Sequence, residues 1–510
     1  MDITRYNQHL ALSDFAREVE RCEFCAIDQE MTGVDLPGVS VPFGASPEAV
    51  YEAKRAAVHA YSAFQMGIAL FTKTENDTYE VRPYNFYLLN SSGDLHLNLS
   101  AVSFLIANHM NFQTWLTSGL PFCTKQEEAV YEEIPTATFT DLAEQEMADE
   151  LIKAIDEWMS TGSEPLVKEL RCVTNFARSL QSFVNHRYDG HISLVYEGKP
   201  YMGEKMKFTL TKLNTNEWIS EQKKRGLECD RKRAQHLGFR QFWKVLVQSG
   251  KPIVGHNFMQ DLMFMIHMHE MPLSMDYLEF KKVLRDLLPV IYDTKTMAIK
   301  LTGDSAFPVT HLEPLYQECR RRAGLSSDLF TQQYVFPPGF YGYNDSAVKL
   351  QGKAHEAAYD AYMTGIVFSL MQKLYPGAFT KLKNVISAFG SVYFFSVDTD
   401  DELVSPSTFI LKCAVPCQLE EIEALFFATE EMTSQTGEKG KVDWKKVSYK
   451  VGGLTISEDA NKYSSFCVVM KQTMTVDDLN GRLESLRDKL LPENTYINRR
   501  LLDLITVHNI

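Results

Sequence analysis

The sequence predicts an α/β protein in which a mixed sheet, flanked by helices, is interrupted by an insert. Strand-like apolar runs at 24–30, 62–72 and 84–89 form the start of a sheet, and helical material follows to about residue 157. The sheet resumes only at 251–255. Beyond about residue 395 the tail alternates strand, helix, strand, strand, helix, strand. These patterns favour a discontinuous core domain followed by a separate α+β domain.

The length of 510 residues and the 45% hydrophobic content are enough for several domains, each with its own core. We expect a first part of the core domain at 1–157, an inserted domain at 158–235, a second part of the core domain at 236–390 and a C-terminal domain at 395–510. In the insert, VTNFARSLQSFVNHRY favours a helix and HISLVYE a strand. The insert is therefore expected to be a small α/β unit.

Two acids, Asp28 and Glu30, close the first strand-like run, FCAIDQE. Because strand side chains alternate between faces, residues two apart lie on the same face. A solvated charge at a sheet edge would explain one of these acids. Two acids ending an otherwise buried run repel each other unless a cation lies near them.

A third acid, Asp261, follows the strand-like segment Lys251–Gly255 in the sequence GHNFMQDLMF. His256 and Asn257 are helix start signals, and apolar residues then recur at a spacing of three or four. Asp261 is thus expected in the first turns of a helix. Taken alone, an exposed acid there is explained equally well by the helix dipole.

The third cluster, HEAAYDAYMTG, supplies His355 and Asp360. An apolar stripe predicts a long helix over 354–374 with Asp360 near its beginning, facing the sheet. Five residues correspond to roughly 140° around an ideal helix. His355 can therefore share a site with Asp360 only if it lies on a frayed first turn or in the preceding loop.

Together, D-x-E, Asp261 and H-x4-D resemble the DEDD superfamily of 3′-to-5′ exonucleases, in the branch that uses histidine. The tyrosine of the alternative branch would fall on Glu356. With YSAFQMGIALF…YNFYLL and YDTKTMA, the motifs as an ordered set resemble the poly(A)-specific ribonuclease family over most of residues 1–390. The resemblance implies a ribonuclease H-like core that removes nucleotides, preferentially adenylates, from RNA 3′ ends.

The residue chemistry agrees with this resemblance. Four carboxylates (Asp28, Glu30, Asp261 and Asp360) can hold two divalent ions ~3.5–4 Å apart, one generating hydroxide and the other stabilising the leaving 3′ oxygen. Mg²⁺ suits an all-oxygen site, and Mn²⁺ can substitute. His355 is expected to act as the general base, since an unperturbed histidine has a pKa of about 6.5. All five residues are thus predicted to be catalytic.

Similarity to the family suggests that Lys295, in YDTKTMA, contacts RNA; a solvated loop lysine is the alternative. Asp293 is expected to be a turn residue or to support the site indirectly. Where the family commonly has an aromatic residue after the Glu, this chain has Met31. The resemblance therefore does not support base stacking at that position.

Family members carry a nucleic-acid-binding domain where this chain has its insert, but the R-x3-H signature of that domain is absent after Arg178. The C-terminal order is compatible with an RNA-recognition-motif-like fold. A tryptophan of this domain can stack on the messenger cap in the family, and Trp444 falls in a similar strand. A packing tryptophan is the alternative.

A net charge of −14 argues against a broadly basic nucleic-acid surface. Nine cysteines at irregular spacings do not indicate a disulfide framework. The sequence has no apolar run long enough to span a membrane and no apolar secretory segment, so we expect a soluble, intracellular protein of the cytoplasm, the nucleus or both.

Three functions compete at this point. The first is a metal-dependent exoribonuclease that shortens poly(A) tails, and the second is the same chemistry trimming small-RNA precursors such as pre-piRNA. The third is a non-catalytic RNA-binding scaffold, whose usual mark would be the loss of a metal ligand; here all four acids and His355 are present. The family tendency to dimerise makes a homodimer the expected assembly.

Overall fold

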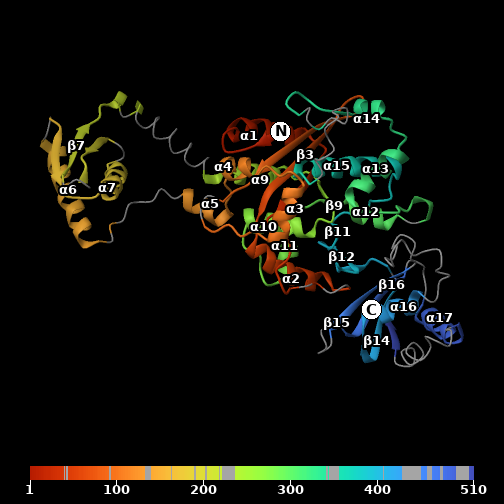
Figure 1. Cartoon of the computed structure of the whole chain (residues 1–510). Helices are drawn as coiled ribbons and strands as arrows, with labels where there is room; N and C mark the ends of the chain where they lie inside the picture. The colour runs from red at the N-terminus through yellow and green to blue at the C-terminus, as the bar shows by residue number, and fades with distance from the viewer. Residues whose placement is uncertain are drawn as a thin grey trace. The chain divides into compact units, whose positions relative to one another are not determined.

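The computed structural model divides into two compact units, Met1–Lys125 with Leu237–Ile510, and Gln126–His236 (Figure 1). It describes the chain except for residues 40, 42–43, 91–92, 133–138, 140, 162–163, 189–190, 201–203, 218, 221–235, 302, 341–342, 344–354, 406, 428–448, 457–461, 471–474, 490–504 and 510. Among the described residues, no helix is both long and apolar enough to cross a membrane.

The first unit is built on a seven-stranded mixed sheet in the order β1-β4-β3-β2-β8-β9, with β10 also pairing with β4. The strands are β1 (Asp2–Ile3), β2 (Phe24–Met31), β3 (Ala63–Lys73), β4 (Tyr79–Tyr87), β8 (Ile253–Gly255), β9 (Ile291–Asp293) and β10 (Tyr334–Val335). β2, β3 and β4 are antiparallel neighbours, whereas β2, β8 and β9 run parallel. The predicted mixed α/β core is confirmed, and β4 begins earlier than the segment 84–89 suggested.

Helices cover this sheet. They are α1 (Gln8–Arg21), α2 (Pro47–Ala60), α3 (Leu99–Ala107), α4 (Phe112–Ser118), α9 (Phe239–Ser249), α10 (Met259–His269), α11 (Tyr277–Leu287), α12 (Thr294–Lys300), α13 (Leu312–Arg322), α14 (Ser327–Gln333) and α15 (Ala357–Leu374), with a 3-10 turn at Gly303–Ser305. A further helix, α5 (Lys125–Glu132), begins at the last residue before the second unit. α15 packs on β2 and β3, and its residues from Ala357 to Met371 are all buried. A helix that is apolar on every side belongs in a core, which explains its place between the sheet and α13.

A small antiparallel sheet of β11 (Val385–Ser387), β12 (Tyr393–Ser396) and β13 (Glu402–Leu403) follows α15 in the chain. The main hydrophobic core of the unit runs from Ile3 to Val397 and includes residues of β2, β3, α10 and α15. The elements that carry the predicted site are therefore packed into one core.

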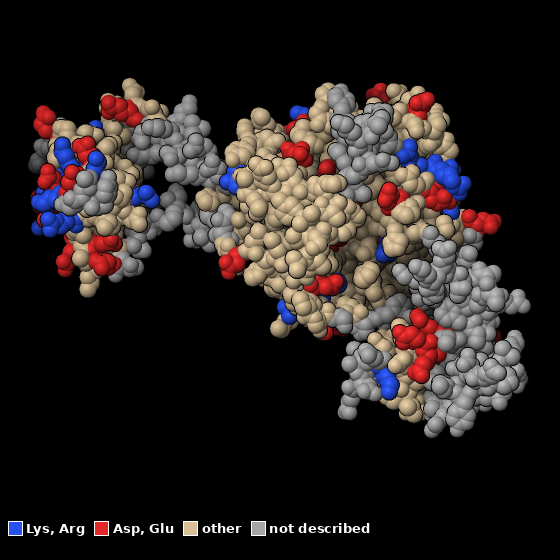
Figure 2. Space-filling view, in the orientation of Figure 1, with Lys and Arg blue, Asp and Glu red and all other residues tan. Residues whose placement is uncertain are grey.

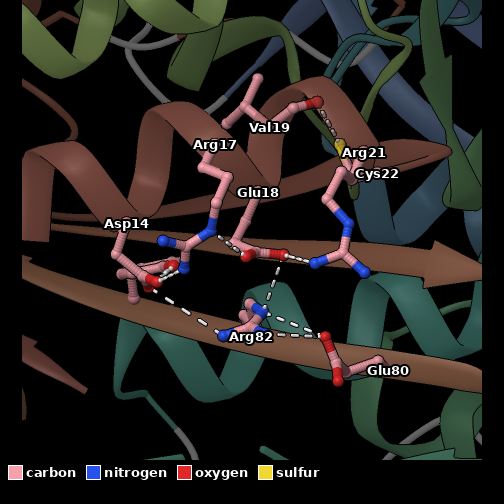
Figure 3. A network of polar contacts seen from close by, with 9 residues as sticks. Asp14, Arg17, Glu18, Val19, Arg21, Cys22, Glu80 and Arg82 are labelled. Atoms are coloured by element: carbon pink, nitrogen blue, oxygen red, sulfur yellow. Dashed lines mark hydrogen bonds and ion pairs between the residues drawn. The ribbon is translucent and has the colours of Figure 1, made fainter.

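An ion-pair network joins α1 to β4 (Figure 3). The Glu18 carboxylate is only 1% exposed. It forms ion pairs with Arg17 at 2.8 Å, Arg21 at 2.8 Å and Arg82 at 3.4 Å. Arg82, from β4, also pairs with Glu80 at 2.8 Å. A buried carboxylate is tolerated only when it is paired. Arg17 and Arg21 belong to α1 itself, so Arg82 is the arginine of this network that links α1 to the sheet.

The second unit has its own core and a three-stranded antiparallel sheet in the order β5-β7-β6. Its elements are α6 (Leu142–Thr161), β5 (Leu166–Leu170), α7 (Thr174–Arg187), β6 (Ile192–Glu197) and β7 (Met206–Lys212). It begins earlier than the boundary at 158 taken from the sequence. The physical reason is that Leu151 and Ile155 of α6 are buried in the core of this unit, so α6 folds with the insert.

The tail forms a four-stranded antiparallel sheet in the order β15-β16-β14-β17. Its elements are β14 (Thr408–Cys417), α16 (Leu419–Phe427), β15 (Tyr449–Ile456), β16 (Tyr463–Met470), α17 (Val476–Lys489) and β17 (Ile505–Asn509). The order from β14 to α17 agrees with the sequence pattern, but the sequence did not predict a strand at β17. The last strand predicted from TYINRRLL, at 495–502, lies outside the described residues, as does Trp444.

Candidate active site

Asp28 and Glu30 lie on one face of β2, near the middle of the sheet. The antiparallel register sets Asp28 opposite Gly67 and Glu30 opposite Gln65, both in β3. Alternation along the strand therefore gives the two carboxylates the common face predicted from the sequence. Both side chains keep part of their surface exposed, so an ion or a substrate can reach them.

Asp261 lies in the first turn of α10, just after the end of β8. Desolvation raises the pKa of Asp261 to about 8. The backbone N–H of Gln29, the residue between Asp28 and Glu30, acts on the Asp261 carboxylate and lowers this pKa in part. Asp261 is thus brought to the two acids of β2 from a segment more than two hundred residues away.

Asp360 lies in the first turn of α15, and His355 lies outside that helix, two residues before Ala357. His355 has a φ of 70°, in the left-handed region, and its backbone N–H offsets part of the effect of desolvation on the pKa of Asp360. The requirement that the histidine precede the regular helix is met. Ligand atoms of Glu30, His355 and Asp360 lie within 4.8 Å of one another.

The four carboxylates share one electrostatic environment. Desolvation and then the charges of Asp360 and Asp261 hold the pKa values of Asp28 and Glu30 well above their usual range. Desolvation raises the pKa of Asp360 to about 7. Such a cluster is costly to ionise without a counter-charge, and a divalent cation would supply one.

Asp360 adds a second sign that the site fits a cation. Its Oδ1 atom is buried and has no hydrogen-bond partner among the described residues. Buried polar oxygens are usually satisfied, and an exception points to an ion or ligand. Carboxylate oxygens are the donors that Mg²⁺ prefers, so the donor set is suitable.

Asp293 has a structural role that is more extensive than the sequence suggested. Its buried carboxylate accepts five backbone N–H bonds, from Asn257 at 3.2 Å, Phe258 at 3.0 Å, Lys295 at 2.8 Å, Thr296 at 3.1 Å and Ser387 at 3.1 Å. It therefore caps α12 and also fixes the turn that leads into α10. Its place at a strand-to-helix junction was the available sequence signal.

Lys295 lies in the first turn of α12 and is partly buried. Its ammonium donates to Asn257 Oδ1 at 3.3 Å and lies 6.0 Å from the ring centre of Phe389. Because Asn257 lies between β8 and α10, this contact places Lys295 near the start of α10.

A pocket of about 320 Å³ opens beside Glu30. It is lined by Glu30 and Met31 of β2, Val34 and Asp35 after that strand, and Asn98, Ser100, Ala101, Phe104 and Leu105 at the start of α3 and along it. The ring of Phe104 is 4.6 Å from that of His355. Sequence reasoning had not selected Phe104, because α3 has no motif that marks it.

Comparisons with known proteins give a consistent family assignment. A family model described as CAF1 family ribonuclease matches residues 3–368. The poly(A)-specific ribonuclease PARN of Danio rerio is 26% identical over 427 residues, covering 76% of this chain and 62% of that protein. The 3′-5′ exoribonuclease parn-1 of Caenorhabditis elegans is 27% identical, covering 73% and 69%. The pre-piRNA 3′-exonuclease trimmer of Bombyx mori is 25% identical, covering 72% and 70%. This chain thus spans less than two thirds of the Danio rerio protein.

Proposed function

Because the chain belongs to the CAF1 ribonuclease family, we propose that it is a 3′-5′ exoribonuclease that shortens RNA 3′ ends by metal-dependent hydrolysis. The observation that supports this most strongly is the convergence of Asp28, Glu30, Asp261 and Asp360 from β2, α10 and α15. Acids so far apart in sequence have no structural reason to share one partly exposed site. A cation site at a phosphodiester gives them one.

The four carboxylates would hold the divalent cations, two Mg²⁺ ions per site, with Mn²⁺ as a substitute. When bound, the cations supply the positive charge that activates water and offsets the charge developing at the scissile phosphate. The carboxylates orient and neutralise this charge. Their raised pKa values explain why they would bind a cation strongly once they are ionised.

His355 would accept the proton of the attacking water. Desolvation lowers its pKa below the usual value, so the imidazole is neutral and able to accept a proton near pH 7. Its side chain is exposed and lies within reach of Glu30 and Asp360. The left-handed backbone at His355 is a strained conformation for a residue with a side chain, and such strain occurs where a side chain must be aimed.

The pocket beside Glu30 would receive the 3′-terminal nucleoside. Phe104 and Met31 offer apolar surface, while Asp35 and Asn98 offer polar groups. An aromatic ring that is 45% exposed at a nuclease site is suited to stacking on a base. Lys295 would contact a phosphate of the RNA, since an ammonium offsets the charge of the phosphate backbone.

We favour poly(A) tails as the substrate, following the names of the Danio rerio and human relatives. Trimming of small-RNA precursors is the second candidate, and the similarity to the Bombyx mori trimmer supports it. Both reactions use the same site. The difference would lie in how the RNA is recruited.

The two accessory domains would bind RNA. The strand order β15-β16-β14-β17 with a βαββαβ chain order is compatible with an RNA-recognition-motif-like domain. Trp444 would stack on a messenger cap. The insert carries lysines and arginines on β5, β7 and nearby loops among its acids (Figure 2), and such side chains can contact phosphates.

We further propose a homodimer. α3 is strongly apolar, and Leu99 and Ile106 are 80% and 62% exposed. The face of the first unit around α3 shows a broad area without charged side chains (Figure 2). Exposed apolar surface of this kind is typical of an interface.

The test is digestion of two 5′-labelled RNAs, one ending in oligo(A) and one in mixed sequence, by wild type and by Asp28→Ala and Asp261→Ala. We expect stepwise, Mg²⁺-dependent shortening by wild type alone, faster on oligo(A). Equal rates on the oligo(A) RNA and the mixed-sequence RNA would favour trimming of small-RNA precursors. Normal cleavage by either variant would contradict the proposed site. Failure of the wild type to cleave either RNA would contradict it too, and would favour the scaffold function if the wild type still bound RNA.

A further inference from the structure

The N-terminus of α15 is held by a side chain from the sheet. The first N–H groups of a helix have no partner within the helix and are usually satisfied by a capping side chain. Glu356, at the capping position of α15, makes no such bond. Instead, the N–H of Ala357 donates to Oε1 of Gln65 at 3.0 Å, across 292 residues of sequence.

Gln65 is well placed to make this bond. It lies in β3 and is 3% exposed. Its carbonyl oxygen accepts the buried hydrogen bond from Ala357. A side chain that is buried in this way has little room to turn its carbonyl oxygen elsewhere.

Gly67 brings α15 close to the same strand. A Cβ atom at Gly67 would lie 2.0 Å from the carbonyl oxygen of Ala357, so only glycine permits the approach. Gln65 and Gly67, two residues apart, share a face of β3. They are the register partners of Glu30 and Asp28. The two residues of β3 that position α15 are thus paired with the two acids of β2.

Asp360 lies three residues after Ala357, and His355 lies two residues before it. A displacement of Ala357 would move both, because only a few residues of backbone separate each of them from Ala357. Glu30 approaches these two residues within 4.8 Å. A shift of the helix start relative to the sheet would therefore change the separation of the three groups.

We propose that Gln65 is a positioning residue of the active site, which, through the N–H of Ala357, sets His355 and Asp360 against Glu30 and so maintains the affinity for a divalent cation. This inference rests on the proposed function, because it assumes that the acids bind the cation. Gln65 itself touches neither cation nor RNA. Groups that orient metal ligands typically change metal affinity by about 10–100-fold when removed.

A purely structural cap predicts a different outcome. It would lower the thermal stability of the unit and leave the affinity of the folded protein for Mn²⁺ unchanged. The positioning role predicts weaker Mn²⁺ binding by protein that is fully folded. Mn²⁺ affinity, rather than activity alone, is therefore the informative measurement.

The experiment uses the full chain and Mn²⁺ alone, with binding measured by titration calorimetry and by electron paramagnetic resonance. Gln65→Met keeps the length of the side chain and removes the acceptor. Ala357→Pro removes the donor from the other side of the bond, at the first helical position, where proline is tolerated. Thr364→Val is the control, because Thr364 is buried in α15 and its hydroxyl has no described partner.

We expect Gln65→Met and Ala357→Pro each to weaken Mn²⁺ binding by about 10–100-fold, and the double variant to lose no more than either alone, since both remove one bond. Thr364→Val should bind as wild type does. On RNA, the variants should need more Mn²⁺ for half-maximal rate, with the KM for RNA unchanged. Ala357→Pro keeps the inference testable if Gln65→Met does not fold.

Wild-type Mn²⁺ affinity in either folded single variant, or an equal loss in Thr364→Val, would overturn the inference and leave the proposed function intact. If the wild type did not bind Mn²⁺, and Asp360→Ala gave the same Mn²⁺ titration as the wild type, the proposed metal site would be overturned and this inference with it. The two failures are therefore distinguishable.

Discussion

The carboxylate of Asp360, on α15, lies close enough to Asp28, on β2, that its charge is the largest electrostatic contribution to the raised pKa of Asp28 after desolvation. A helix and a strand more than three hundred residues apart thus present like charges to each other. This arrangement lowers stability unless a cation is bound, and it leads directly to the first prediction.

Asp28→Asn should abolish turnover and, in metal-free buffer, raise the melting temperature of the first unit. The substitution removes one of four mutually repelling carboxylates without changing the volume of the side chain. Mg²⁺ should raise the melting temperature of wild type, because a ligand that binds the folded state stabilises it. Thermal unfolding with and without Mg²⁺ checks this. An equal Mg²⁺ shift in both proteins would contradict the role of Asp28.

Arg82→Met should destabilise the first unit by about 2 kcal/mol, because it removes a cation from the buried Glu18 (Figure 3). Glu18 keeps Arg17 and Arg21 as partners, so the loss should stay below that of an unpaired buried charge. The specific activity of the folded protein should not change. Urea unfolding is the measurement.

Arg17→Met is the matched control, since Arg17 is 61% exposed and its pairing with Glu18 is screened by water. It should cost much less than Arg82→Met. Equal losses would mean that the burial of Arg82 does not matter to the network.

His269→Phe should reduce the acid sensitivity of the fold. Both ring nitrogens of His269 are buried without a described partner, and desolvation, followed by the charge of Arg240, lowers its pKa to about 3. Between about pH 6.5 and pH 3, the imidazole of His269 is therefore protonated in the unfolded chain but not in the folded chain. Stability is lost as the pH falls from about 6.5 towards 3, by up to about 1.4 kcal/mol per pH unit.

Urea unfolding at pH 7.5 and 5.5 checks this. The difference between the two pH values should be smaller in His269→Phe than in wild type. His9→Phe, at an exposed position of α1, should keep the wild-type difference. Identical pH dependence in all three proteins would contradict the assignment to His269.

The sequence located the acids because strand alternation and helix phase are local properties. β2 and the start of α10 could be predicted from apolar periodicity, and the place of His355 before α15 from helix geometry. Phe104 and Gln65 could not be predicted in the same way, because their importance depends on contacts with His355 and Ala357, hundreds of residues away. The boundary of the insert was missed because the apolar face of α6 does not reveal which core it joins.

Asp293→Asn should lower both the stability of the first unit and the rate of RNA shortening. The carboxylate accepts backbone N–H groups at both oxygens, whereas an amide offers one acceptor and one donor. The donor would face the N–H groups of Phe258 and Ser387. We expect a loss of about 2–4 kcal/mol, since two N–H groups lose their acceptor.

Because the turn held by Asp293 leads into α10, Asp261 should also be displaced. The Mg²⁺ concentration for half-maximal rate should therefore rise. Asp400→Asn, at an exposed position, is the control for the loss of one charge. A variant that is destabilised but keeps the wild-type Mg²⁺ requirement would show that Asp293 supports the fold and not Asp261.

Gly67→Ala should separate α15 from β3. The new methyl group would lie 2.0 Å from the carbonyl oxygen of Ala357 and 2.3 Å from the nitrogen of Ala358. Both are backbone atoms, so no side-chain rotation relieves the overlap and the helix start must move. We expect a loss of about 3 kcal/mol and a fall in activity of the remaining folded protein, because Asp360 moves away from Asp28.

Gly481→Ala, where a Cβ meets nothing within 4 Å, should be neutral or stabilising in its helix. Thermal unfolding and single-turnover RNA cleavage measure the two effects separately, and full activity in folded Gly67→Ala would show that the site tolerates a displaced α15.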